Sequence, residues 1–194
     1  MKISTCIVLG WLLVALPLPA RAASIELVAS DQTCHLDLSS ANPTGTFTIV
    51  AVRAAEATCC PGFTGAEFGV EGLSTDWLAI ATPNPNAVVV IGSPIGNGVN
   101  IAFATDIMDP SVQLFSVSIT YLSAGEPQPA VLRVVAKDPP SNQDWTCPLV
   151  TGGGGCPCWA MACATGGSLY INSTGDCLVG VQSGAWSSIK GLFR

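Results

Sequence analysis

Charged residues are scarce in this chain. Only 10% of its 194 residues are Asp, Glu, Lys or Arg, and 49% are hydrophobic, whereas a soluble domain ordinarily carries about 25% charged residues. Intrinsically disordered chains show the opposite balance, so we expect most of this chain to fold around an apolar core. The net charge is −6, and no cluster of Lys and Arg could neutralise a row of phosphates. The composition therefore argues against nucleic acid as a partner.

Long apolar runs are confined to residues 1–22. This segment starts with the basic Lys2, continues with an apolar run over residues 7–18 and ends with the small-residue triplet Ala20-Arg21-Ala22. That pattern predicts a secretory signal peptide cleaved before Ala23. The alternative is a membrane anchor, but two prolines interrupt the run, and it is shorter than the roughly 20 residues that span a bilayer. We expect a protein that is secreted to the extracellular space, envelope or periplasm and is not an integral membrane protein once processed.

Histidine occurs once, at His35, so a Ser-His-Asp or Cys-His site would have to be built on that residue. No Gly-x-Ser-x-Gly elbow surrounds any serine. Glu67 and Glu71 are predicted to lie on one strand face about 13 Å apart. That separation exceeds the roughly 5–9.5 Å of glycosidase carboxylate pairs, so we interpret the two as part of a solvated face. We predict no catalytic residue, no cofactor and no metal ligand.

Helical periodicity is missing between residues 46 and 137. Short runs typical of strands follow one another instead, several of them alternating between polar and apolar residues, and turns rich in Pro, Gly and Asn separate them. The runs cover residues 46–52, 66–73, 77–81, 87–91, 99–103, 112–122 and 130–137. Short strands with regular turns predict a mainly β protein, an antiparallel sandwich of two sheets over residues 23–140 that is immunoglobulin-like or cohesin-like.

The alternation also predicts which side chains face the core. In the run 112–122, the predicted core-facing residues are Gln113, Phe115, Val117, Ile119 and Tyr121. In the run 66–73, the polar side chains of Glu67 and Glu71 are predicted to face water.

The composition changes after Pro140, where Gly, Cys, Thr and Ser dominate. Residues 152–155 are four glycines, which we interpret as a loop tip because the Gly-Lys-Ser/Thr of a phosphate loop does not follow. Disulfides are expected to hold this segment, because thiols oxidise outside the cell and the spacing does not favour zinc. The eight candidate cysteines are Cys34, Cys59, Cys60, Cys147, Cys156, Cys158, Cys163 and Cys177.

Three of these cysteines precede residue 100 and five follow it, so at least one bridge must join the two groups if all eight are oxidised in one chain. Cys59 and Cys60 are adjacent, and adjacent cysteines lie too close to bond each other in the usual geometry. We predict that Cys34 pairs with one of them and that the other reaches the C-terminal group.

The last eleven residues predict a short helix. Trp186, Ile189 and Phe193 have the spacing i, i+3, i+7 of one helix face. So short a helix is stable only when its apolar face is docked. We expect residues 141–194 to form a Gly/Cys-rich extension that ends in this helix and packs on the same domain. The alternative is a recognition tail that presents the three side chains to a partner.

Several segments resemble small secreted bacterial β-sandwich proteins that have no assigned function. They are Gly65-Ala66-Glu67-Phe68-x-Val70-Glu71-Gly72-Leu73, Trp77, Thr82-Pro83-Asn84-Pro85, Gly98-Val99-Asn100-Ile101-Ala102-Phe103, Leu132-Arg133-Val134-Val135-Ala136-Lys137 and Trp186-Ser187-Ser188-Ile189-Lys190-x-Leu192-Phe193-Arg194. This resemblance implies a bacterial source and an envelope or extracellular site, and it implies no catalytic residue. More loosely, Gly-Ala-x-Phe followed by a Trp is similar to cohesin-like sandwiches, which dock partners.

Two classes of function follow. The favoured one is a noncatalytic secreted or envelope β-sandwich with a structural or partner-binding role, whose partner is another envelope or extracellular protein or a glycan. The alternative is a secreted hydrolase with a site assembled from dispersed carboxylates and serines. A deep pocket with converging carboxylates would favour the hydrolase, and shallow exposed faces would favour the binding module.

Overall fold

The computed structural model describes residues 23–53, 62–152 and 161–175, and these residues form twelve β-strands and no helix. None of their segments is a helix long and apolar enough to cross a membrane. The strands are β1 (Ala23–Ala29), β2 (His35–Leu36), β3 (Thr44–Arg53), β4 (Phe63–Glu71), β5 (Trp77–Pro83), β6 (Ala87–Ser93), β7 (Gly98–Ile107), β8 (Ser111–Tyr121), β9 (Ala130–Val135), β10 (Leu149–Gly152), β11 (Met161–Gly166) and β12 (Ser168–Ile171). The mainly β prediction is confirmed.

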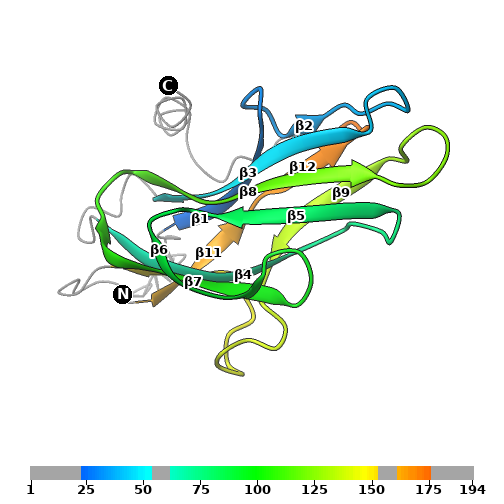
Figure 1. Cartoon of the computed structure of the whole chain (residues 1–194). Helices are drawn as coiled ribbons and strands as arrows, with labels where there is room; N and C mark the ends of the chain where they lie inside the picture. Colours follow the sequence, from blue (N-terminus) through cyan, green and yellow to red (C-terminus); the bar gives the residue numbers. More distant parts are fainter. Residues whose placement is uncertain (1–22, 54–61, 153–160, 176–194) are drawn as a thin grey trace, which may run out of the picture.

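The strands pack in two layers, as the sandwich prediction expects, but the layers belong to one continuous sheet. Its order is β2-β12-β9-β4-β10-β11-β1-β3-β8-β5, and β7 extends it from β4 to β6. In Figure 1, β3, β8 and β5 form the upper layer, and β4 and β7 form the lower one. Strands β10 and β11 join the layers by pairing with β4 and β1 respectively. The prediction of two separate sheets is therefore wrong.

The core lies between the layers. Phe68 of β4 and Phe115 of β8 are almost fully buried, and their rings meet edge to face with centroids 6.2 Å apart. Trp77 packs on Tyr121 at the rim, with ring centroids 5.0 Å apart. Burying large side chains of this kind between two layers is the main favourable contribution to the fold.

Most of the predicted core face of β8 is confirmed, with one exception. Phe115 to Tyr121 alternate as expected, but Gln113 is half-exposed while Val112 and Leu114 are buried. The ladder to β3 shifts register at this point, because Ile49 faces Phe115 whereas Val50 faces Gln113. A β-bulge of this kind exchanges the two faces of a strand.

The predicted water-facing side of β4 needs a larger correction. Glu71 is exposed, but Glu67 retains only 9% of its accessible surface. The residues around Ser141 cover it, since the Ser141 backbone N–H donates to Glu67 Oε1 at 2.9 Å. Alternation within β4 carries no information about a cover that comes from 74 residues further along the chain.

The sheet is also not wholly antiparallel. Strand β1 pairs with β11 in parallel, and β12 pairs with β2 in parallel. Strands β10, β11 and β12 all follow Pro140, so this Gly- and Cys-rich region supplies three strands to the sheet. The expected signal peptide and the expected terminal helix both lie outside the described residues.

Candidate functional site

Two rows of side chains cross the outer face of the lower layer. Residues directly opposite each other on neighbouring strands project to the same face of a sheet. The register of β6, β7, β4, β10 and β11 gives one row of Ile91, Asn100, Glu67, Leu149 and Cys163, and a second row of Val89, Ala102, Gly65, Thr151 and Met161. Segments far apart in the sequence therefore form one continuous surface.

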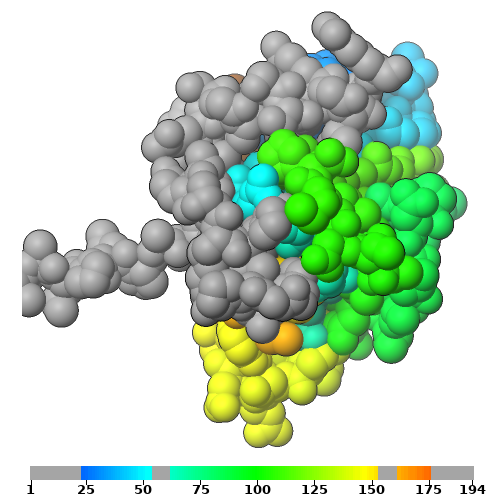
Figure 2. Space-filling model, turned by 90° about the vertical axis from the view of Figure 1, so that its left-hand side faces the viewer, coloured from blue at the N-terminus to red at the C-terminus, as the bar shows by residue number. Residues whose placement is uncertain are grey.

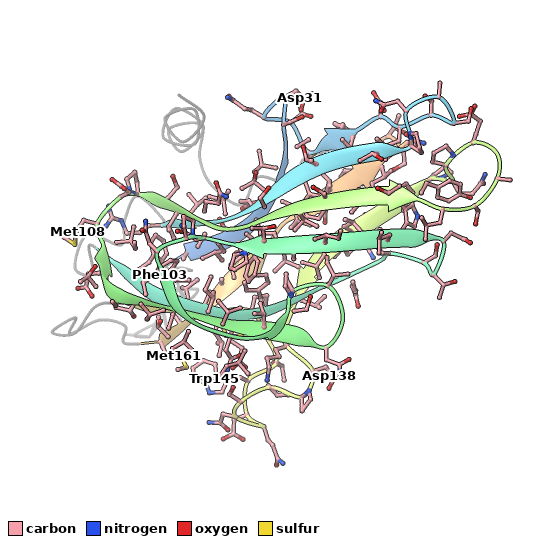
Figure 3. The ribbon with its side chains drawn as sticks, viewed as in Figure 1. Asp31, Phe103, Met108, Asp138, Trp145 and Met161 are labelled. Carbon is pink, nitrogen blue, oxygen red and sulfur yellow. A yellow bond between two sulfur atoms is a disulfide. The ribbon has the colours of Figure 1, made fainter. Side chains whose placement is uncertain are left out.

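A loop turns this surface into a groove. Residues 138–148 leave the body after β9 and return to β10, and Figure 2 shows this segment, in yellow, projecting beyond the other described residues. Trp145 and Met161 both lie below β4 and β7, on the side away from β3, β5 and β8 (Figure 3).

We call the resulting open space, about 580 Å³ in volume, the Trp145 groove. It is lined by Ala66, Glu67, Asn100, Ile101, Ala102, Ser141, Asn142, Trp145, Leu149, Thr151 and Met161.

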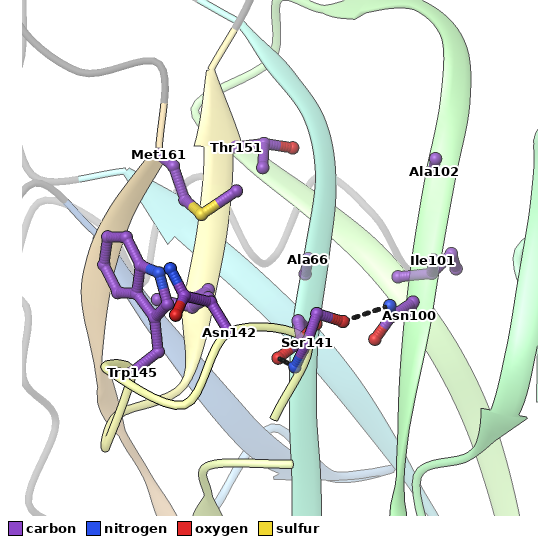
Figure 4. A pocket seen from close by; sticks show the side chains of 11 residues that line it. Ala66, Asn100, Ile101, Ala102, Ser141, Asn142, Trp145, Thr151 and Met161 are labelled. Carbon is purple, nitrogen blue, oxygen red and sulfur yellow. Dashed lines mark hydrogen bonds between the residues drawn. The ribbon is translucent and has the colours of Figure 1, made fainter. Parts of the chain in front are cut away.

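A short hydrogen-bond chain forms one side of the groove. The Ser141 N–H donates to Glu67 Oε1, and the side-chain amide of Asn100 donates to Ser141 Oγ, each at 2.9 Å. Asn100 Oδ1 is buried and has no hydrogen-bond partner. Figure 4 shows Asn100 and Ser141 on one side of the groove, with Trp145 and Met161 on the other. The groove thus combines an acidic polar side with an apolar, aromatic side.

A disulfide anchors the Trp145 side. Cys147, two residues after Trp145, is bonded to Cys163 of β11, with the two Cα atoms 5.6 Å apart. A turn within the loop adds a second restraint, because the backbone N–H of Trp145 donates to the backbone carbonyl of Asn142 at 3.0 Å. These two links fix the backbone of the loop next to the sheet at Trp145.

Strand β6 extends the apolar surface beyond the groove. Val89 and Ile91 are 43% and 62% exposed, and Met161 at the opposite end is 46% exposed. The sequence contains no Asp, Glu, Lys, Arg or His between Asp76 and Asp106, so β6 and most of β7 are free of charge. Exposed apolar surfaces of this kind typically mark sites of protein interaction.

The residues that the sequence singled out are only partly brought together. Cys147 and Cys163 are bonded to each other, and Cys34 is also disulfide-bonded. The other candidate cysteines, Cys59, Cys60, Cys156, Cys158 and Cys177, lie outside the described residues, as do Trp186, Ile189 and Phe193. The predicted bridges from Cys34 to one of Cys59 and Cys60, and from the other to the C-terminal group, therefore remain predictions.

His35 lies on β2 and does not line the groove. Its ring stacks on Tyr170 with centroids 5.5 Å apart. Among the described residues, no group of three His, Cys, Asp or Glu side chains is arranged to hold a metal ion.

Four residues that build the groove were not predicted as site residues from the sequence: Trp145, Asn100, Ser141 and Met161. One local signal was present for Trp145, since a large aromatic residue stands in a polar loop between Pro139-Pro140 and Cys147-Pro148. Side chains on loops fixed by a scaffold frequently carry function. The other three residues are recognisable only from the strand register.

The fold is similar to that of solved cohesin modules. The cohesin module of a family 33 glycoside hydrolase from Clostridium perfringens ATCC13124 superposes with a TM-score of 0.52 at 12% identity, over 78% of this chain and 96% of that module. The fold is cohesin-like. The seventh ScaB type I cohesin from Pseudobacteroides cellulosolvens gives a TM-score of 0.43 at 9% identity, over 79% of this chain and 94% of that one. No protein-family model and no curated protein sequence matches the chain.

Proposed function

We propose that this chain is a noncatalytic, secreted binding module that takes up an extended segment of another extracellular protein in the Trp145 groove. The observation that carries the proposal is the pair of side-chain rows that run from β6 to β11 under Trp145. Five strands spaced about 4.8 Å apart span about 19 Å, the length of an extended peptide of about six residues.

The side chains along the rows favour a peptide over a glycan. Ile91, Val89, Ala102 and Met161 offer contacts that match apolar side chains, and among the described residues that line the groove only Trp145 offers an aromatic platform. Flat aliphatic surfaces with one aromatic anchor are typical of protein interfaces.

The groove gives little support to the hydrolase alternative. Glu67 is the one acidic residue among the described residues that line it, whereas glycoside hydrolysis uses a pair of carboxyl groups. Ser141 is the serine that lines the groove; its Oγ accepts a hydrogen bond from the Asn100 side-chain amide, and none of the described residues that line the groove is a histidine that could take its proton. A nucleophilic serine needs an adjacent base to remove its proton.

A phage-displayed library of random peptides tests the proposal. Clones selected on the wild-type protein should bind the Trp145→Ala variant at least about tenfold more weakly, because an interface anchor of this size contributes 1–2 kcal/mol or more. Ile91→Asp should weaken binding as well. Ile80→Asp is the matched control, because Ile80 is 59% exposed, close to the 62% of Ile91, but lies on β5 in the other layer.

Selected peptides that bind all four proteins equally would contradict the proposal. Retention of cellohexaose or chitohexaose by the wild type but not by Trp145→Ala would replace the peptide with a glycan. If the wild type hydrolyses nitrophenyl esters or glycosides and Glu67→Gln abolishes this activity, the hydrolase alternative would be favoured over the binding module.

A further inference from the structure

Glu67 is largely buried, and no basic side chain among the described residues is paired with its carboxyl group. The residue is about nine-tenths buried, and its Oε1 accepts one hydrogen bond, from the Ser141 N–H. Its Oε2 makes no hydrogen bond and Glu67 forms no ion pair within the described part of the chain, yet the residue lines the groove. A buried carboxylate is normally paired, because removing a charge from water costs several kcal/mol unless a partner compensates.

The surroundings of Glu67 make the groove more negative. Asn100 lies opposite Glu67 in the β4–β7 ladder, and its Oδ1 is buried without a hydrogen-bond donor. The partial negative charge of this oxygen adds to that of the carboxylate. No Lys or Arg lines the groove among residues 62–152 and 161–175. Lys137, the basic residue nearest in sequence to the loop, donates instead to the Pro139 carbonyl at 2.9 Å.

The apolar side of the groove suits the stem of a long basic side chain. In Figure 4, Trp145 and Met161 lie on one side of the groove, and Asn100 and Ala102 of β7 lie on the other. Lys and Arg place their methylene groups along apolar surface and keep the charged head near polar groups. An indole face also attracts a cation electrostatically.

We propose that the Trp145 groove binds a positively charged side chain, Arg or Lys, of the partner segment, with the cationic head on Glu67 and the stem between Trp145 and the β7 surface. This inference rests on the proposed function and names the chemistry that the groove selects. The oxygen acceptors of Glu67 and Asn100 should favour a cationic side chain over a neutral one of the same shape. Citrulline provides that comparison, because it matches arginine in size but carries no charge.

Small probes test this directly. N-acetylarginine N-methylamide and its citrulline counterpart are titrated separately into the ¹⁵N-labelled protein, and the indole N–H signal of Trp145 is followed after assignment with Trp145→Phe. The arginine probe should move this signal with an affinity at least about tenfold higher than that of the citrulline probe, because a charge-assisted hydrogen bond to a carboxylate is roughly twice as strong as a neutral one.

A pair of charge-neutralising variants supplies the control. Glu67→Gln keeps an oxygen that accepts from the Ser141 N–H and removes the charge, so it should erase the preference for arginine. Glu71→Gln removes the same charge from the exposed end of the same strand, outside the groove, and should leave the preference unchanged.

Equal affinity of the two probes for the wild type, or no movement of the Trp145 signal up to the solubility limit of the arginine probe, would overturn this inference. The wild-type comparison stands even if Glu67→Gln does not fold. Peptides from the library that bind through Trp145 and Ile91 but contain no basic residue would overturn it too, while leaving the proposed function intact.

Discussion

Glu67 and Asn100 lie directly opposite each other on β4 and β7, and Ser141 is hydrogen-bonded to both. Two adjacent strands and a loop 41 residues after Asn100 thereby meet at one point. The loop sits on the sheet through this contact on one side and through the Cys147–Cys163 disulfide on the other. A groove that is held at both ends loses little entropy when it binds a ligand.

Gly65 allows β4 to pack closely against β7 beneath the groove. A Cβ at this position would collide with the Ile101 carbonyl oxygen and lie 3.1 Å from Thr151 Oγ1. Gly65→Ala should therefore lower the free energy of unfolding by about 1–3 kcal/mol, measured by urea denaturation. Gly69→Ala on the same strand is the control, because a Cβ there makes contacts of 3.4 Å and longer. That variant should keep or slightly raise stability, and equal losses for both would refute this role of Gly65.

Phe68 should be one of the most sensitive positions in the core. Its side chain is fully buried and meets Phe115 across the layers. Phe68→Ala leaves a cavity between them, so we expect a loss of about 3–5 kcal/mol in the free energy of unfolding. Ile80→Ala, at an exposed position on β5, should change it by no more than about 0.5 kcal/mol. A loss below 1 kcal/mol for Phe68→Ala would show that the layers collapse into the space.

The seven central strand runs could be predicted from sequence because they are short, several of them alternate between polar and apolar residues, and turns rich in Pro, Gly and Asn separate them. Strand β1 gives no such signal. It pairs with β3 on one side and β11 on the other, and all seven residues from Ala23 to Ala29 are buried, including Ser24 and Glu26. Burial of both faces removes the alternation on which the prediction depends.

The groove could not be predicted for a related reason. Glu67 alternates like a solvated residue, and its cover is a loop that follows it by 74 residues. Strands β10 and β12 have four residues each and stand among glycines, so their own propensities are weak. Their position is determined by pairing with β4 and β9, which is a property of the whole fold.

Ser40, in the loop between β2 and β3, is hydrogen-bonded to Glu126, in the loop between β8 and β9, and this contact should depend on pH. Ser40 Oγ donates to Glu126 Oε1 at 2.5 Å and the Ser40 N–H donates to Oε2 at 2.9 Å. The side-chain bond, followed by the backbone bond, lowers the pKa of Glu126 below its usual 4.5. The contact therefore stabilises the fold above the unfolded-state pKa, and this stabilisation is lost as the pH falls through the lower folded-state pKa.

Ser40→Ala should raise the pKa of Glu126 towards 4.5, without reaching it because the backbone bond remains. A ¹³C NMR titration of the Glu126 carboxyl carbon measures this change. Ser123→Ala is the control, since the Ser123 hydroxyl bonds to Asp76 and not to Glu126. A pKa of Glu126 that stays the same in Ser40→Ala would exclude the hydroxyl as the cause of the shift.

The Cys147–Cys163 disulfide should both stabilise the fold and restrain the loop that carries Trp145. The bridge closes a loop of 16 residues, for which the chain-entropy model gives about 3 kcal/mol. Replacing both cysteines by serine should lower the free energy of unfolding by that amount and speed amide hydrogen exchange in residues 141–146, because Trp145 lies two residues before the bridge. Exchange in the middle of β8, which is bonded to β3 and β5 on its two sides, should stay slow and serves as the internal control. A variant that loses stability but keeps slow exchange around Trp145 would show that the Ser141 contacts alone position the indole, and library peptides should then bind it as tightly as they bind the wild type.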